Sequence, residues 1–190
     1  DAAVPELLFG DDRLVNIRWL MESGCYGRLE SIIPPITVPA WMCMSCSQDP
    51  GSLGVYGFRN RRDHSYDGLS IVNAKSLQDL TIWDQVAREG KRSVIIGVPP
   101  SFPPRKVNGI CVGCFLTPDT TTDNYTHPAA IRDTIRDLVG EYPVDVKGFR
   151  TERKDWLLDE IYAMSVKHFA NVRHWLKNAD WDYFHFVEIG

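Results

Sequence analysis

The hydrophobic positions of this chain follow two spacings, one typical of helices and the other of strands. Four segments carry apolar residues every three or four positions, as an amphipathic helix does: residues 11–23, 81–90 and 128–139, and a segment that follows Thr151. With Thr151 as its N-cap, the last helix is expected to run for about 26 residues, roughly 39 Å at 1.5 Å per residue. Four shorter apolar runs predict strands: residues 29–33, 93–98, 107–115 and 183–189.

Proline, glycine and capping residues mark the boundaries between these segments. Pro39 suits the first turn of a further helix. Residues 48–57 are rich in glycine and predict a loop, as do residues 116–127, which are dominated by Thr, Asp and Asn. Thr81 and Asp84 have the spacing of a capping box. A helix, a glycine and an apolar strand follow one another here. This order is the helix–strand half of a unit in a parallel sheet.

The order of elements predicts an α/β fold, a layered and mostly parallel sheet with helices on both faces. The 190 residues, 44% of them hydrophobic, suffice for one domain with a sizeable core over residues 1–190. The chain opens on Asp1 and its last ten residues form an apolar strand with no cap or polar tail. We therefore expect a piece of a longer chain.

Charge and cysteine content restrict the environment and the partners. The net charge is −4, which argues against nucleic acid and anionic membrane as partners. No apolar run reaches the roughly 18 to 20 residues of a membrane-spanning helix, and no secretory leader is evident. The five cysteines are odd in number and argue against a secreted disulfide scaffold. We expect a soluble, cytoplasmic protein with free thiols, and its oligomeric state is left open.

Thr37 lies between Pro35 and Pro39, where an extended segment is expected to pass into a helix. A hydroxyl at this position lies beside unpaired backbone N–H groups and the positive end of the helix, and both favour an anion such as phosphate. The hydroxyl becomes a good nucleophile only when a metal or a base lowers its pKa. The alternative interpretation is that Thr37 is simply an N-cap.

The sequence PPITVPAW, followed by QDPGSLGVYGFRNRR, resembles the nucleophile region of the type I phosphodiesterase and nucleotide pyrophosphatase branch of the alkaline phosphatase superfamily. TIWDQVAREGKRSVIIGVP is similar to the helix and strand that follow the nucleophile in this branch, and VEIG resembles the strand before the later metal ligands. The resemblance implies an alkaline phosphatase-like fold, of which this chain is the incomplete N-terminal part.

The resemblance also implies a reaction and a set of site residues. Thr37 would be the nucleophile of a hydrolase acting on a small phosphate ester or nucleotide, and Asp1 would bind the metal nearest to it. Two divalent ions, zinc or else manganese, would lower the pKa of the hydroxyl and stabilise an in-line displacement. Asn60 and Arg59 are candidates for phosphate binding. The other ligands would follow Gly190, and we expect activity to require them.

Departures from the family pattern keep other functions open. Leu53 stands where nucleotide pyrophosphatases often carry His, which suggests a substrate other than a nucleotide. A non-catalytic relative with an anion pocket near Thr37 and Arg59 is one alternative. A phosphoglycerate mutase or a sulfatase of the same superfamily is another, although their Ser or modified Cys nucleophiles disfavour both.

Other metal-binding or polar residues have structural interpretations. Two C-x-x-C pairs suggest a zinc site, but their separation and surroundings favour buried free thiols: Cys43, Cys46, Cys111 and Cys114. Arg59, Arg61 and Arg62 fit a phosphate contact or a solvated turn equally well. We expect His168 to pack on the apolar face of the long helix, and His185 to be structural within the last strand. Glu188 either points toward the site or has a backbone or helix-cap partner.

Overall fold

The computed structural model describes residues 11–63 and 65–189. The chain divides into two compact units, Asp1–Ser31 and Ile32–Gly190. Within the first unit, α2 (Val15–Ser23) confirms the helix predicted over residues 11–23. It ends where the amide of Gly24 donates to the carbonyl of Leu20 at 3.0 Å.

The second unit contains a mixed sheet in the strand order β5-β4-β3-β6. The strands are β3 (Ser93–Ile96), β4 (Gly109–Val112), β5 (Thr126–His127) and β6 (Tyr183–Phe186). β3 pairs in parallel with β4 and β6, and β5 pairs antiparallel with β4. The expected α/β fold with a mostly parallel sheet is therefore present.

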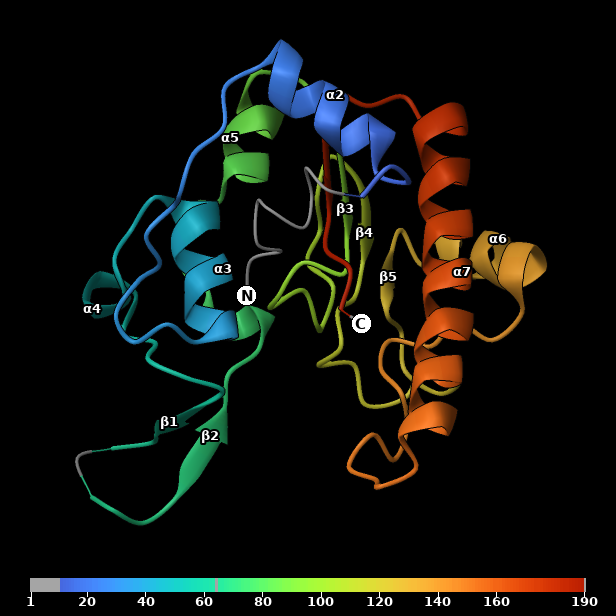
Figure 1. Ribbon diagram of the computed structural model, residues 1–190. Coiled ribbons are helices and arrows are strands. Elements are labelled where there is room, and N and C mark those ends of the chain that lie inside the picture. The colour runs from blue at the N-terminus through green and yellow to red at the C-terminus, as the bar shows by residue number, and fades with distance from the viewer. Residues whose placement is uncertain (1–10, 64, 190) are drawn as a thin grey trace. The chain divides into compact units, whose positions relative to one another are not determined.

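Strand alternation separates two apolar clusters, one on each face of this sheet. One cluster joins residues of β3, β4 and β6 to Ile135 of α6 (Ile131–Val139) and to Val172 and Trp175 of α7 (Lys154–Asn178). The other joins Ile95 and Cys111 to Trp83 of α5 (Ile82–Arg88). Figure 1 shows α6 and α7 on one side of the strands and α5 on the other.

A third cluster surrounds α3 (Thr37–Cys46), which is followed by the short helix α4 (Pro50–Leu53). Its buried members come from α3 and from the segments after it: Val38, Met42, Val55, Val72 and Leu77. In the sequence, Val55 and Val72 flank a hairpin of β1 (Arg59–Arg61) and β2 (Leu69–Ile71). A single 3-10 turn, η1 (Ala74–Ser76), follows the hairpin. In Figure 1 the hairpin projects away from the four-stranded sheet.

Glycine permits close approach of the strands at the edge where β3 ends. Gly97 has φ +69°, and a Cβ there would lie 2.8 Å from the carbonyl oxygen of Val187. The amide of Val187 in turn donates to the carbonyl of Ile96 at 3.0 Å. The carboxyl ends of β3 and β6 are therefore held side by side.

Three local predictions were wrong. Residues 29–33 form no strand, because Leu29 and Ile33 are 90% and 84% exposed and the segment has no pairing partner among the described residues. The predicted loop 48–57 contains α4, because the carboxylate of Asp49 accepts the amides at 51 and 52 and Pro50 has no amide hydrogen to leave unpaired. Thr151 lies before the long helix rather than at its N-cap, which is Arg153.

The length of the long helix was predicted well, since α7 has 25 residues. The capping box is also confirmed, with the amide of Asp84 bonded to the hydroxyl of Thr81 and the carboxylate of Asp84 bonded to the amide of Thr81. No helix among the described residues is both long enough and apolar enough to cross a membrane.

Candidate active site

Thr37 is the first residue of α3 and its side chain is exposed. The preceding residue, Ile36, is extended (φ −114°, ψ 137°) and provides no side-chain cap, and the first turn carries no acidic residue. The amides of a first helical turn have no acceptor within their own helix. The hydroxyl of Thr37 thus lies at an uncompensated positive helix end that is open to an anion.

The rest of the first turn fixes this position against the core. Val38 is fully buried and Pro39 is buried beside it. Trp41, one turn after Thr37, contacts the ring of His185 in β6 with centroids 5.6 Å apart. In Figure 1, α3 begins at the level where β6 ends. The start of α3 therefore lies near the carboxyl edge of the parallel strands, where α/β folds gather their ligands.

The segment after α4 passes beside the start of α3. A Cβ on Gly57 would lie 3.9 Å from the Cδ1 atom of Ile36. The next residue, Phe58, contacts Phe115 with ring centroids 6.0 Å apart. The side-chain amide of Asn60 donates to the carbonyl of Gly54 at 3.0 Å. Gly57 thus lies beside Ile36, whereas no contact joins Asn60 or Arg59 to Thr37 within the described residues, and part of the hydrogen-bonding capacity of Asn60 is already used.

The arginines of this region lie on the exposed hairpin. Arg59 and Arg61 belong to β1, and the guanidinium of Arg61 lies 4.2 Å from the ring centroid of Tyr66. The amide of Arg62 donates to the carbonyl of Gly68 at 3.2 Å. These contacts favour the solvated-turn interpretation for Arg61 and Arg62, and a phosphate contact by Arg59 stays a prediction.

The four cysteines of the two C-x-x-C motifs form no disulfides, in agreement with the preferred interpretation as free thiols. Burial raises the pKa of Cys46 to about 11, with the charge of Asp79 adding to the rise, and burial raises the pKa of Cys111 to about 12. With no metal bound, thiols of this kind are protonated at neutral pH. Across residues 11–63 and 65–189, no three His, Cys, Asp or Glu side chains gather as a metal site would require. The proposed metal ligand Asp1 lies outside the described residues.

His168 and Glu188 form a polar network that the sequence did not predict. The Nδ1 atom of His168 lies 2.9 Å from a carboxylate oxygen of Glu188, and its Nε2 atom lies 2.7 Å from the carbonyl of Pro143. The hydroxyl of Ser165 donates to the other oxygen of Glu188 at 2.5 Å. Both ring nitrogens of His168 therefore face oxygen acceptors.

These contacts confirm the packed position expected for His168 and correct the expectation for Glu188. His168 is 4% exposed and lies on the packed face of α7, but it also bonds to the segment after β6. The partners of Glu188 are side chains of α7, rather than a backbone group, a helix cap or the site around Thr37. Burial would raise the pKa of Glu188, but the hydrogen bonds from His168 and Ser165 and the charge of His168 lower it overall.

His185 lies inside β6, half-buried, as expected. Its Nδ1 atom lies 3.1 Å from the hydroxyl of Tyr183, and burial lowers its pKa, so the neutral imidazole is favoured. Its ring contact with Trp41 joins β6 to α3. A structural role for His185 therefore fits its surroundings.

The comparison with protein families agrees with the resemblance in the sequence. The model described as type I phosphodiesterase / nucleotide pyrophosphatase matches residues 1–189. The chain belongs to this family, whose members are phosphoester hydrolases that generally depend on divalent metals. A search of curated proteins and a search of solved structures returned no match.

Proposed function

We propose that this chain is the N-terminal part of an alkaline phosphatase-like hydrolase that cleaves a phosphodiester or pyrophosphate through Thr37. Two observations carry the proposal. The hydroxyl of Thr37 is exposed at the positive start of α3, whose N-cap residue makes no side-chain hydrogen bond, and the chain belongs to the family. In this proposal the sheet is layered between helices, and the start of α3 faces the substrate at the carboxyl edge. A small phosphate ester or nucleotide would be the substrate.

The reaction places the phosphoryl group at the start of α3. The Oγ atom of Thr37 loses its proton, forms a bond to phosphorus and displaces the leaving alcohol or phosphate, which takes up a proton. Water then hydrolyses the resulting threonine phosphodiester, which releases a phosphate monoester and regenerates the hydroxyl. The free amides of the first helical turn would stabilise the negative charge on the phosphoryl oxygens.

The residues present fit a metal in part, because the accessible hydroxyl of Thr37 is a suitable oxygen donor. With Asp1 it would hold the nearer of two divalent ions, zinc or manganese, and the remaining ligands would follow Gly190. When bound, such ions lower the pKa of the attacking hydroxyl and neutralise phosphoryl charge. Asn60 and Arg59 are proposed to contact the phosphate, Arg59 from the exposed edge of the hairpin.

The direct test measures hydrolysis of bis-p-nitrophenyl phosphate by the full-length protein in the presence of zinc. Thr37→Ala is expected to lower kcat/KM by at least about 100-fold, since it removes the nucleophile, while Thr37→Ser retains part of the activity. Thr122→Ala is the matched control, because Thr122 is exposed in a loop and is expected to leave the rate unchanged. Comparable turnover by Thr37→Ala would show that Thr37 is not the nucleophile. Phosphate binding without any turnover would favour the non-catalytic alternative.

A further inference from the structure

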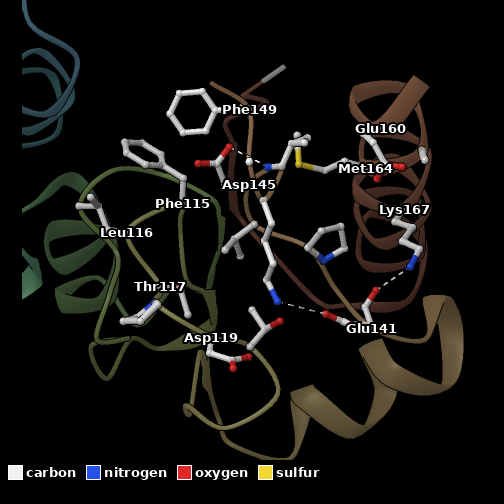
Figure 2. A pocket seen from close by; sticks show the side chains of 18 of the residues that line it. Phe115, Leu116, Thr117, Asp119, Glu141, Asp145, Phe149, Glu160, Met164 and Lys167 are labelled. Atoms are coloured by element: carbon white, nitrogen blue, oxygen red, sulfur yellow. Dashed lines mark hydrogen bonds and ion pairs between the residues drawn. The ribbon is translucent and has the colours of Figure 1, made fainter. Parts of the chain in front are cut away.

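A cavity of about 750 Å³ opens in the second unit beyond the end of β4. Four parts of the chain form it: Ile71 at the end of β2, the loop after β4, the loop between α6 and α7, and the first half of α7. Figure 2 shows Phe115 and Thr117 facing Met164 and Lys167 across it. A volume of this size accommodates an organic group as large as a drug-sized ligand.

Two residues of the cavity wall also pack against the apolar cluster around α3. Phe115 and Leu116 line the cavity, and both also pack against the cluster that contains Val38, the neighbour of Thr37 in sequence. Phe115 contacts Phe58 of the segment that passes beside Ile36. A chain of contacts thus leads from Ile36, before the start of α3, through Gly57 and Phe58 to Phe115 at the cavity wall.

The walls combine apolar surface with excess negative charge. More than half of the lining residues are apolar, among them Phe149, Trp156 and Met164. The charged ones are four acids and two lysines, giving a net charge of −2: Asp119, Glu141, Asp145, Glu160, Lys147 and Lys167. Both lysines bond to Glu141, one to its carboxylate at 4.0 Å and one to its carbonyl at 2.8 Å. Figure 2 draws both contacts.

Two of these features disfavour an anion in the cavity. The carboxylate of Asp119 accepts the amide and hydroxyl of Thr121, and the side-chain hydrogen bond is the larger of the causes that lower its pKa, so Asp119 stays ionised at neutral pH. The charge of Lys147 is partly offset by the carboxylate of Glu141, whereas Lys167 donates to the uncharged backbone carbonyl of Glu141. Thr117, 4% exposed, lines the cavity and its hydroxyl has no hydrogen-bond partner within the described part of the chain.

We propose that this cavity binds the leaving group of the substrate, and that this group is an uncharged, apolar alcohol of aryl or bulky alkyl type. The inference rests on the proposed function, because it takes Thr37 as the point of attack. Attack by the Thr37 oxygen forms the new bond to phosphorus as the bond from phosphorus to the alcohol oxygen breaks, and the departing alcohol gains a proton. The enzyme is thus a phosphodiesterase that disfavours pyrophosphates, whose leaving group is an anion.

The first experiment measures binding alone, with 2-naphthol as the probe and isothermal titration calorimetry on the full-length protein. Ala163→Trp, which adds a ring to the cavity wall, is expected to raise the Kd of 2-naphthol at least about tenfold. Tyr162→Trp is the matched control, because Tyr162 is the adjacent residue of α7, is 64% exposed and lies outside the cavity lining. Equal binding by Ala163→Trp and the wild type would overturn the assignment of the cavity.

The second experiment compares methyl 2-naphthyl phosphate with the same diester carrying a sulfonate on the naphthyl ring. We expect kcat/KM to favour the uncharged leaving group by at least about fivefold, since two net negative charges repel the sulfonate at close range. Glu160→Gln and Asp145→Asn together should reduce that preference. A preference for the sulfonate, or one unchanged in the double variant, would overturn the proposal.

The two experiments separate this inference from the proposed function. Binding of 2-naphthol needs no turnover and is expected to survive Thr37→Ala. If 2-naphthol binds and Ala163→Trp weakens it, but Thr37→Ala hydrolyses the diester normally, then the nucleophile is wrong and the cavity remains a site for apolar alcohols. If hydrolysis depends on Thr37 while Ala163→Trp changes neither binding nor KM, the cavity assignment alone is wrong.

Discussion

Two threonines stand at the start of helices in the second unit, and their surroundings differ. Thr81 precedes α5 and is fully buried, and its hydroxyl donates to the carboxylate of Asp84 at 2.7 Å and accepts the amide of Asp84 at 3.3 Å. Thr37 is the first residue of α3, is exposed, and caps nothing. One hydroxyl is used by the fold, whereas the other is available to a ligand.

This difference gives a criterion for separating structural from functional polar groups. A structural group is buried and has its hydrogen bonds satisfied by the chain, because an unsatisfied buried group costs free energy. A functional hydroxyl at a helix start stays accessible, and it then makes no capping hydrogen bond to the helix. His168 and Glu188 fall in the first class, although the place of Glu188 after β6 left a role at the site open.

The largest effect on stability is expected for the buried His168. His168→Ala removes the hydrogen bonds to Glu188 and Pro143 and the ring contact with Tyr142, and it leaves a partly buried carboxylate without its main partner. We expect a loss of about 2 to 4 kcal/mol in the free energy of unfolding, measured by urea denaturation. His174→Ala, at a more exposed position of α7, should cost less than about 1 kcal/mol. Equal losses for both variants would contradict a structural role for the network.

A smaller effect is expected at the two threonines themselves. Thr81→Ala removes a capping hydroxyl and should lower the free energy of unfolding by about 1 to 2 kcal/mol, with Thr81→Ser recovering most of it. Thr37→Ala removes no cap and should change it by less than about 0.5 kcal/mol. Thermal or urea unfolding of the three variants tests the comparison directly. A cost at Thr37 as large as that at Thr81 would mean that Thr37 has a structural role after all.

The smallest effect concerns the pH dependence of stability through Glu188. Its pKa is lowered in the folded protein, so the carboxylate stabilises the fold above the pKa of an unfolded Glu, about 4.3, and this contribution is lost as the pH falls through the lower, folded value. The difference in unfolding free energy between wild type and Glu188→Gln should be constant from about pH 6 to 7 and shrink below about pH 4.3. Glu152→Gln, at an exposed site, should show no such change. A difference that grows on acidification would reverse the assigned direction.

Local sequence rules predicted the elements that depend on their own residues. The run SVII gives β3, the Thr81 and Asp84 pair gives the capping box, and the apolar periodicity gives α7. The same rules failed at residues 29–33, where an apolar run found no neighbouring strand. They also missed the β1–β2 hairpin, because its strands are only three residues long and mostly exposed, so no apolar alternation marks them.

Some features of the candidate site were likewise predictable from local sequence, and others were not. Prolines on both sides of Thr37 predicted that a helix starts there, and the motif around it identified the family. The partners of Glu188 were not predictable, because Ser165 and His168 lie 23 and 20 residues away in the chain and meet Glu188 only through packing of α7 on β6. The cavity beyond β4 is formed by four separate segments, and no single one of them carries a signal of its own.

The amino-acid sequence by itself determined the family, the mostly parallel α/β sheet and the helix that begins at Thr37, because these depend on short-range spacing, capping and turn chemistry. Only the tertiary structure decided which polar groups are satisfied and which are accessible: Thr81 buried, Thr37 open, and Glu188 bonded to α7. The reason is physical. Burial and hydrogen-bond partners arise from contacts between segments far apart in the chain, and the spacing of residues within one segment carries no information about them.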